Sequence, residues 1–254
     1  MKPTFTQFSN FIKEITNFTE KKLKNSFENH NFYSHKKQDG TILTNSDLEI
    51  ENYIRSEINK RFPSDSQIGE EYSDIINKSS FSWIIDPIDG TLSFANGVPL
   101  FGTLIGLLEN DEPLYGSINF PMIDKSLLLG DNYVANINGT TLKTTRFNGW
   151  EDSLILTTDF NRLEQSRFIK PWKNLQNMGA ICRTWGDCYG YYLLCSGKAD
   201  IMMDLDMKNH DILTIIPILK GAGVEIIDLS VSQDFTSIIA CKNEIKDELL
   251  DLFS

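Results

Sequence analysis

Apolar residues recur at helical spacing in the first quarter of the chain. Residues 5–24 carry them at intervals of three or four positions, which predicts one amphipathic helix. A polar loop containing glycine and candidate capping residues follows. Residues 47–62 then place isoleucine at positions four apart, and this predicts a second helix that ends before Pro63.

After the second helix the pattern changes to that of strands. Short apolar runs separated by turn residues predict a mostly antiparallel sheet. The expected strands are 81–86, 101–110, 113–120, 125–130 and a short piece near Tyr133.

The second half of the chain alternates strands and helices, which is typical of an α/β arrangement. The expected order is strand 153–158, helix 161–178, strand 179–183, helix 187–196, strand 199–204, a helix from Asp211, strands 224–227 and 236–240, and a last helix. The pattern changes within the polar stretch 136–150. We therefore divide the chain into halves 1–145 and 146–254 and expect a site in the cleft between them.

Charge and composition narrow the function. The 254 residues are 41% hydrophobic, and 24 Lys and Arg against 35 Asp and Glu give a net charge of −11. This charge argues against nucleic acid and anionic membranes as partners. Glycine and proline interrupt the uncharged stretch 90–108, so we expect no membrane span there.

The cysteines and the N-terminus indicate a cytoplasmic protein. Four cysteines without a CxxC pair or zinc-type spacing fit reduced thiols. The first fifteen residues include charged and polar positions where a signal peptide would have an unbroken apolar core, so we expect no export.

Carboxylates surround the strand at 81–86. Glu70 and Glu71 precede it, Asp86 and Asp89 follow it, and Asp211 begins a distant helix. Taken singly, they could be solvated loop acids, turn formers and a helix-capping acid. As a set, and together with Asp47, they suggest a cation site, because clustered buried carboxylates repel one another without one. Hard oxygen ligands favour Mg2+ or Mn2+.

A phosphate seat follows the second of these aspartates. A short helix is expected to begin at Thr91, and Gly90 has no side chain to keep a ligand from the backbone N–H groups. Metal ions beside a phosphate suggest phosphoryl chemistry without a protein nucleophile.

The GEE loop, the segment WIIDPIDGT and the later helix-initial aspartate resemble the inositol monophosphatase superfamily of magnesium-dependent, often lithium-sensitive phosphomonoesterases. The resemblance runs over nearly the full chain. It implies an α/β (α+β) fold, layered as an αβαβα sandwich, a small phosphorylated substrate and a homodimer. It also implies two to three Mg2+ ions, for which Mn2+ could substitute.

The resemblance assigns roles to individual positions. Glu70, Asp86 and the carbonyl of Ile88 would bind one ion, and Asp86, Asp89 and Asp211 a second. A weaker third ion would rest on Glu70. The residues implied in catalysis are Glu70, Asp47 and Thr91, and the amides that would hold the phosphate are those of Gly90 and Thr91.

Residues 183–204 are similar to the branch of the superfamily that hydrolyses histidinol phosphate. Arg183, Asp187 and Asp204 would then contact the leaving alcohol. A carboxylate suits histidinol, whose ammonium and imidazole can both be cationic near neutral pH. On position alone, Asp187 could equally cap a helix, Asp204 end a strand and Arg183 serve a structural ion pair.

One departure from the family pattern concerns the residue before the last metal acid. The family commonly has Trp there, and this chain has His210. We interpret His210 as a packing replacement, because the acidic metal set is complete without it. Inositol monophosphate or another small sugar phosphate stays open as the substrate. A catalytically silent regulator is the alternative from another class, but such a protein would not need the intact acids.

Overall fold

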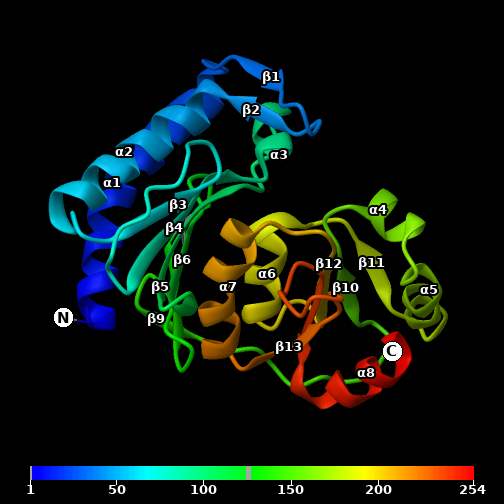
Figure 1. Cartoon of the computed structure of the whole chain (residues 1–254). Coiled ribbons are helices and arrows are strands. Elements are labelled where there is room, and N and C mark those ends of the chain that lie inside the picture. Colours follow the sequence, from blue (N-terminus) through cyan, green and yellow to red (C-terminus); the bar gives the residue numbers. More distant parts are fainter. Residues whose placement is uncertain (1, 124–126) are drawn as a thin grey trace.

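The computed structural model describes residues 2–123 and 127–254, which form five alternating layers (Figure 1). Helices α1 (Phe5–Asn29) and α2 (Asn45–Arg61) cover one face of a seven-stranded sheet. Helices α6 (Asp187–Cys195) and α7 (Asn209–Gly221) lie between this sheet and a five-stranded one. The outer layer holds α4 (Phe160–Gln165), α5 (Ile169–Asn177) and α8 (Lys246–Phe253). The predicted αβαβα sandwich is confirmed.

The larger sheet contains the strands of the first half. Its order is β3-β4-β5-β6-β7-β8-β9, and all neighbours are antiparallel except β3 and β4. The bounds are β3 Ser66–Gly69, β4 Phe81–Asp89, β5 Gly102–Glu109, β6 Glu112–Asn119, β7 Leu127–Gly130, β8 Ala135–Ile137 and β9 Thr140–Leu142. A separate hairpin, β1 (Ser34–Lys36) and β2 (Ile42–Thr44), lies near the short helix α3 (Thr91–Ala95).

The smaller sheet is mixed, in the order β11-β10-β12-β14-β13. Strand β10 runs parallel to both of its neighbours, and the remaining pairs are antiparallel. The bounds are β10 Leu154–Leu156, β11 Ile181–Arg183, β12 Ile201–Asp204, β13 Val224–Asp228 and β14 Ile238–Lys242, followed by the 3-10 turn η1 Asn243–Ile245.

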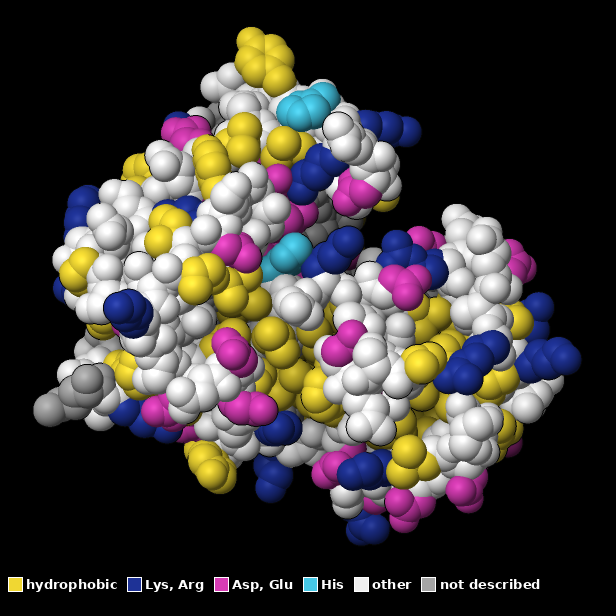
Figure 2. Space-filling model, viewed as in Figure 1, with side chains coloured by type: hydrophobic (Ala, Val, Ile, Leu, Met, Phe, Trp, Pro, Cys, Tyr) yellow, Lys and Arg dark blue, Asp and Glu magenta, His cyan; other side chains and the backbone are white. Residues whose placement is uncertain are grey.

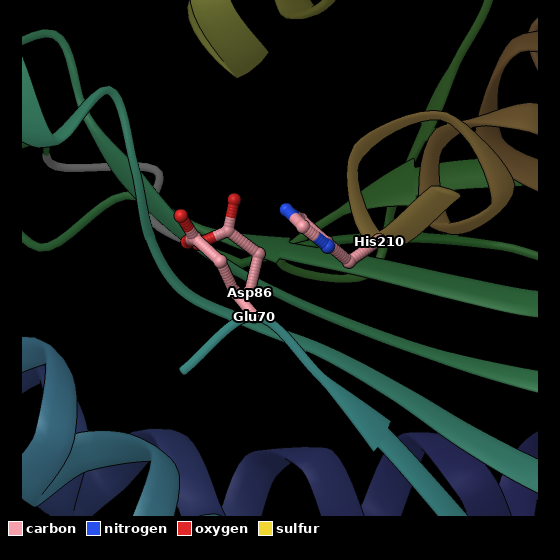
Figure 3. Close-up of side chains that lie close together, drawn as sticks. All are labelled: Glu70, Asp86 and His210. Atoms are coloured by element: carbon pink, nitrogen blue, oxygen red, sulfur yellow. The ribbon is translucent and has the colours of Figure 1, made fainter. Parts of the chain in front are cut away.

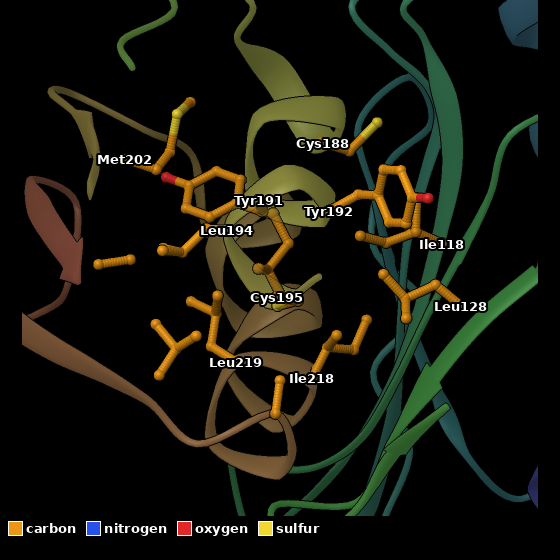
Figure 4. Packing of buried hydrophobic residues seen from close by; sticks show 14 of the residues in the cluster. Ile118, Leu128, Cys188, Tyr191, Tyr192, Leu194, Cys195, Met202, Ile218 and Leu219 are labelled. Carbon is orange, nitrogen blue, oxygen red and sulfur yellow. The ribbon is translucent and has the colours of Figure 1, made fainter. Parts of the chain in front are cut away.

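Three apolar cores lie between the layers and hold them together. One joins α1 and α2 to the larger sheet, and another joins the smaller sheet to the outer helices. The central core includes Ile118 and Leu128 of the larger sheet, Leu219 of α7 and Met202 of the smaller sheet (Figure 4). Because this core takes residues from both halves of the chain, it fixes the start of α7 relative to the end of β4.

Two of the differences from the predicted elements have local causes. The helix expected at 161–178 is divided into α4 and α5, because the Ser166 hydroxyl accepts a hydrogen bond from the Phe168 N–H at 3.1 Å and competes with the helix. The polar stretch 136–150 contains the β8–β9 hairpin, whose turn residues Asn138 and Gly139 both have positive φ.

The observed bounds of several strands also differ from the predicted ones. Tyr133 lies in a bend, and strand β8 starts two residues later. The strand predicted at 125–130 is seen from Leu127, and Lys125 and Ser126 lie outside the described residues. Strands β1, β2 and β3 were not predicted, because three or four residues are too few to establish an alternating pattern.

Strand β4 continues past its predicted end at Asp86. Its pairing with β5 shifts between Asp86 and Asp89, so that the chain forms a bulge there. Pro87 fits the bulge because it has no N–H to contribute to the ladder. The bulge keeps both aspartates within one strand and alters the direction in which each points.

Within the described ranges, none of the helices has the length and apolar character needed to cross a bilayer.

We predict that Gly116→Ala destabilises the fold by about 2 kcal/mol, because a methyl group there would overpack the contact between β6 and α7. An ideal Cβ at this position would lie 2.0 Å from the backbone carbonyl oxygen of Thr214. Urea unfolding measures the effect. Gly139→Asn is the matched control, since that turn is open and Asn tolerates positive φ. Equal stability of the two variants would contradict the prediction.

Candidate active site

Three predicted metal acids converge where β4 meets the start of α7. Oxygen atoms of Asp86, Asp89 and Asp211 all lie within 4.8 Å of one another. The first two come from the bulged end of β4, and the third from the first turn of α7. Residues more than a hundred positions apart thus form one cluster of carboxylates.

These aspartates also serve the local backbone. Asp86 Oδ1 accepts a hydrogen bond from the Ile88 N–H at 2.9 Å, and Asp211 Oδ2 accepts one from the Lys208 N–H at 3.0 Å. Asp89 Oδ2 accepts one from the Cys188 N–H at 2.5 Å, which ties β4 to α6. The turn and capping interpretations therefore hold together with the clustering.

Glu70 and Glu71 are held by a lysine that the sequence did not single out. Lys37, just after β1, places its Nζ 2.7 Å from a carboxylate oxygen of each glutamate. Burial alone would lower the pKa of Lys37, but its bonds to the two carboxylates outweigh burial and raise that pKa. The lysine pair in the preceding polar loop was the only signal in the sequence.

A buried ion pair on α2 holds the GEE loop in place. Arg55 Nε lies 2.7 Å from Glu51 Oε1, and Glu51 Oε2 accepts the Glu71 N–H at 2.8 Å. An ideal Cβ on Gly69 would lie 2.1 Å from Glu51 Oε1, so only glycine permits this approach. Glu51 was not predicted, because its position on α2 is evident only once the loop packs against it.

Asp47 and Thr91 meet beside the cluster. Asp47 Oδ2 accepts the Thr44 N–H at 2.8 Å, and Asp47 Oδ1 lies 3.4 Å from the Thr91 hydroxyl. That hydroxyl is nearer, at 2.8 Å, to the carbonyl oxygen of Ile88. Burial, and then the charge of Glu70, raise the pKa of Asp47 to about 6 against the bonds from Thr44.

Gly90 precedes α3 with φ +83, in the left-handed region that favours glycine. An ideal Cβ there would lie 3.0 Å from Asp187 Oδ2 and from the carbonyl oxygen of Leu100. The carboxylate of Asp187 thus lies directly beside the predicted phosphate seat.

The three predicted substrate contacts lie in different surroundings. Asp187 begins α6, and its N–H donates to the Thr158 hydroxyl at 2.8 Å. Asp204 is buried and accepts bonds from the Thr158 N–H at 2.9 Å and the Tyr191 hydroxyl at 3.0 Å. Arg183 is exposed, donates to the Cys182 carbonyl at 2.7 Å and lies over the Trp185 ring.

His210 lies at the cluster of carboxylates. One of its ring nitrogens lies within 4.8 Å of carboxylate oxygens of both Glu70 and Asp86, and the three side chains point toward one another (Figure 3). Its Nε2 is 3.4 Å from Asp211 Oδ1.

Crowding of negative charge shapes the electrostatics. Burial, followed by the charges of Glu70, Asp89 and Asp211, raises the pKa of Asp86 well above its usual value. Burial, followed by the charges of Asp187 and Asp211, does the same for Asp89. A divalent cation would offset this repulsion, so the hard, anionic oxygen donors fit Mg2+ or Mn2+.

Two further aspartates carry raised pKa values. Burial raises the pKa of Asp187 to about 7, with the charges of Asp204 and Asp211 adding to it. Burial also raises the pKa of Asp204, to about 6, although its hydrogen bonds lower it.

The protein surface is hollowed between its two halves, with acidic and basic side chains at the edges of the hollow (Figure 2).

Comparison with known proteins identifies the class. The model of the inositol monophosphatase family matches residues 6–251. A histidinol-phosphatase of Chlorobaculum parvum is 35% identical over 187 residues, which are 74% of this chain and 72% of that protein. A fructose-1,6-bisphosphatase/inositol-1-monophosphatase of Aquifex aeolicus is 29% identical over 180 residues, covering 70% of this chain and 68% of that protein.

A solved structure shares the fold. The extragenic suppressor protein suhB of Bartonella henselae has a TM-score of 0.89 at 21% identity, covering 97% of this chain and 98% of that one. Fold, site chemistry and family match together define a metal-dependent phosphomonoesterase. The chain belongs to the inositol monophosphatase family.

We predict that Mg2+ raises the melting temperature more at pH 7.5 than at pH 5. The pKa of Asp47 is raised from 3.8 to about 6 and that of Asp187 to about 7, so folding favours their protonated forms. The stability of the metal-free protein should then fall as pH rises from about 4 to about 7. The pKa values of the proposed ligands Asp86, Asp89 and Asp211 are raised as well, and their ionised forms bind Mg2+ without first losing protons.

Thermal melts with and without Mg2+ at the two pH values measure this difference. In Asp89→Asn, the Mg2+-dependent increase should shrink at pH 7.5. If Mg2+ raised the melting temperature of the unmodified protein equally at both pH values, the ion would not be bound by these acids.

Proposed function

We propose that this protein is a Mg2+-dependent phosphatase that hydrolyses histidinol phosphate to histidinol. The observation that carries the proposal is the convergence of Asp86, Asp89 and Asp211 within 4.8 Å beside Gly90. The sequence relationship to a histidinol-phosphatase supports the choice of substrate.

The acids would divide the metal ions among them. Glu70, Asp86 and the Ile88 carbonyl would hold one ion, Asp86, Asp89 and Asp211 a second, and Glu70 a weaker third. When bound, such ions lower the pKa of water and neutralise charge on the phosphate. The Gly90 and Thr91 amides would orient the phosphate, because Gly90 leaves the backbone accessible.

Asp47 and Thr91 would position the attacking water. The Thr91 hydroxyl lies between Asp47 Oδ1 and the Ile88 carbonyl, at 3.4 and 2.8 Å. A hydroxyl has one proton to donate and can also accept, so it can bond the carbonyl and a water together. The Asp47 carboxylate is held at its other oxygen by Thr44. If the Thr91 hydroxyl turns its proton from the carbonyl to Asp47 Oδ1, it passes that proton to Asp47 and takes the proton of the attacking water.

The leaving alcohol would meet Asp187. Its carboxylate lies beside Gly90, so the ammonium group of histidinol phosphate, three bonds from the ester oxygen, would lie near it. Asp204 would add negative charge deeper in the protein. Thr158 links the two residues, because its N–H donates to the Asp204 carboxylate and its hydroxyl accepts the Asp187 N–H. Arg183 would contact the substrate from the edge of the site.

Inositol monophosphate or another sugar phosphate is the second candidate. It is favoured by the similarity to the fructose-1,6-bisphosphatase/inositol-1-monophosphatase of Aquifex aeolicus.

We also propose that residues 1–145 supply most metal and phosphate contacts and residues 146–254 the leaving-group contacts. A homodimer and a cytoplasmic location stay predictions.

We predict that the wild-type protein releases phosphate from histidinol phosphate with Mg2+, and that Asp89→Asn lowers kcat by about 100-fold or more through loss of metal binding. A phosphate-release assay over histidinol phosphate, inositol monophosphate and fructose 1,6-bisphosphate measures both effects. Asp74→Asn, which changes an exposed carboxylate between β3 and β4, is the control. Preference for a sugar phosphate would reject histidinol phosphate, and inactivity with all three would favour a silent regulator.

We predict that Asp187→Asn raises KM for histidinol phosphate about tenfold, which corresponds to ~1.4 kcal/mol of lost binding. KM for inositol monophosphate should change much less, because a neutral polyol forms no ion pair with the carboxylate. Steady-state kinetics on both substrates provide the comparison, with the exposed Glu164→Gln as control. Equal increases for both substrates would mean that Asp187 does not recognise the cation.

A further inference from the structure

A histidine occupies the first turn of α7 immediately before Asp211. Its side chain is 16% exposed, and one ring nitrogen faces the carboxylates of Glu70 and Asp86 (Figure 3). The helix fixes its backbone, because the His210 carbonyl accepts the Thr214 hydroxyl at 3.0 Å. His210 therefore points into the site and not into an apolar core.

The spacing fits a shared ion. Two donors bound to one ion at about 2.1 Å each lie at most about 4.2 Å apart. The donor atoms of Glu70, Asp86 and His210 already lie within 4.8 Å of one another, so small side-chain movements bring all three into range. This set shares Glu70 and Asp86 with the first proposed ion.

The neighbours of His210 support this arrangement. Asp211 Oδ1 lies 3.4 Å from Nε2 of His210, so the imidazole lies beside the second group of acids as well. Lys37 holds Glu70 but also contacts Glu71 at the same distance, 2.7 Å. The ammonium can therefore remain on Glu71 when Glu70 turns to a metal ion.

We propose that His210 is a nitrogen ligand of the metal ion held by Glu70 and Asp86. This inference rests on the metal set of the proposed function and adds a ligand to it. Imidazole binds Mn2+, Co2+ and Zn2+ better than Mg2+, which prefers oxygen. The mixed nitrogen and oxygen set therefore shifts this one site toward transition metals, while the site of Asp86, Asp89 and Asp211 keeps oxygen ligands only.

Pulsed electron paramagnetic resonance of the Mn2+-loaded full chain tests the bond directly. A bound imidazole gives echo modulation from its 14N nucleus, and labelling the protein with 15N-histidine should change the modulation frequencies. The modulation should be absent in His210→Leu. It should persist in His35→Gln, which removes an exposed histidine of β1. The chain has three histidines, so the assignment is simple.

Metal affinity provides a second readout. Calorimetric titration of wild type and His210→Leu should show the Mn2+ dissociation constant rising about tenfold, and that of Mg2+ by no more than about threefold. In His210→Asn, which offers an amide oxygen in place of the ring nitrogen, Mn2+ binding should stay weakened. Equal changes for the two metals would overturn the selectivity.

The outcomes separate this inference from the proposed function. A phosphatase that is active with Mg2+ but shows no histidine modulation with Mn2+ would reject the His210 bond and keep the function. A modulation that depends on His210, in a protein that hydrolyses none of the phosphates tested, would reject the function and keep the bond. Modulation equal in wild type and His210→Leu would also reject the bond.

Discussion

Mutual repulsion of buried carboxylates is the constraint on which this structure depends. Oxygen atoms of Asp86, Asp89 and Asp211 lie within 4.8 Å of one another; burial raises the pKa of each, and neighbouring carboxylate charges, from Asp211 for Asp86 and Asp89 and from Glu70 for Asp211, add to it. Side chains free to move would separate. They cannot, because the central core packs α7 against the larger sheet, and Gly116 and Gly130 let the helix backbone approach the strands closely. Apolar packing thus maintains a charge arrangement that a divalent cation would relieve.

In several of these acids, one carboxylate oxygen accepts a backbone N–H and the other faces the site. Asp86 Oδ1 accepts the Ile88 N–H, Asp211 Oδ2 the Lys208 N–H and Asp47 Oδ2 the Thr44 N–H. A carboxylate held at one oxygen has its second oxygen fixed in direction, because the group is planar and its torsions are restricted. The turn-forming and cap-forming roles are therefore the means by which the site is preorganised.

The sequence predicted the fold and the acid cluster because both leave strong local marks. Isoleucine spacing marks α2, and DPIDG marks the bulged end of β4. Lys37 left no comparable mark, since the three-residue strands of its hairpin bury almost nothing. The position of His210 also depends on the packing of α7 against β4, which no local pattern contains. Local signals therefore predicted the acids of the cluster and missed the side chains that reach it through tertiary packing.

The position of Asp187 connects metal binding with the choice of substrate. Its carboxylate lies beside Gly90, and its charge contributes to the raised pKa of Asp89. A neutral leaving group leaves this repulsion in place, whereas an ammonium or imidazolium next to Asp187 offsets it and favours the ionised form of both acids. Because ionised Asp89 is the form that would hold a metal ion in the proposed site, a cationic substrate would strengthen metal binding there, and by linkage the metal would strengthen binding of that substrate.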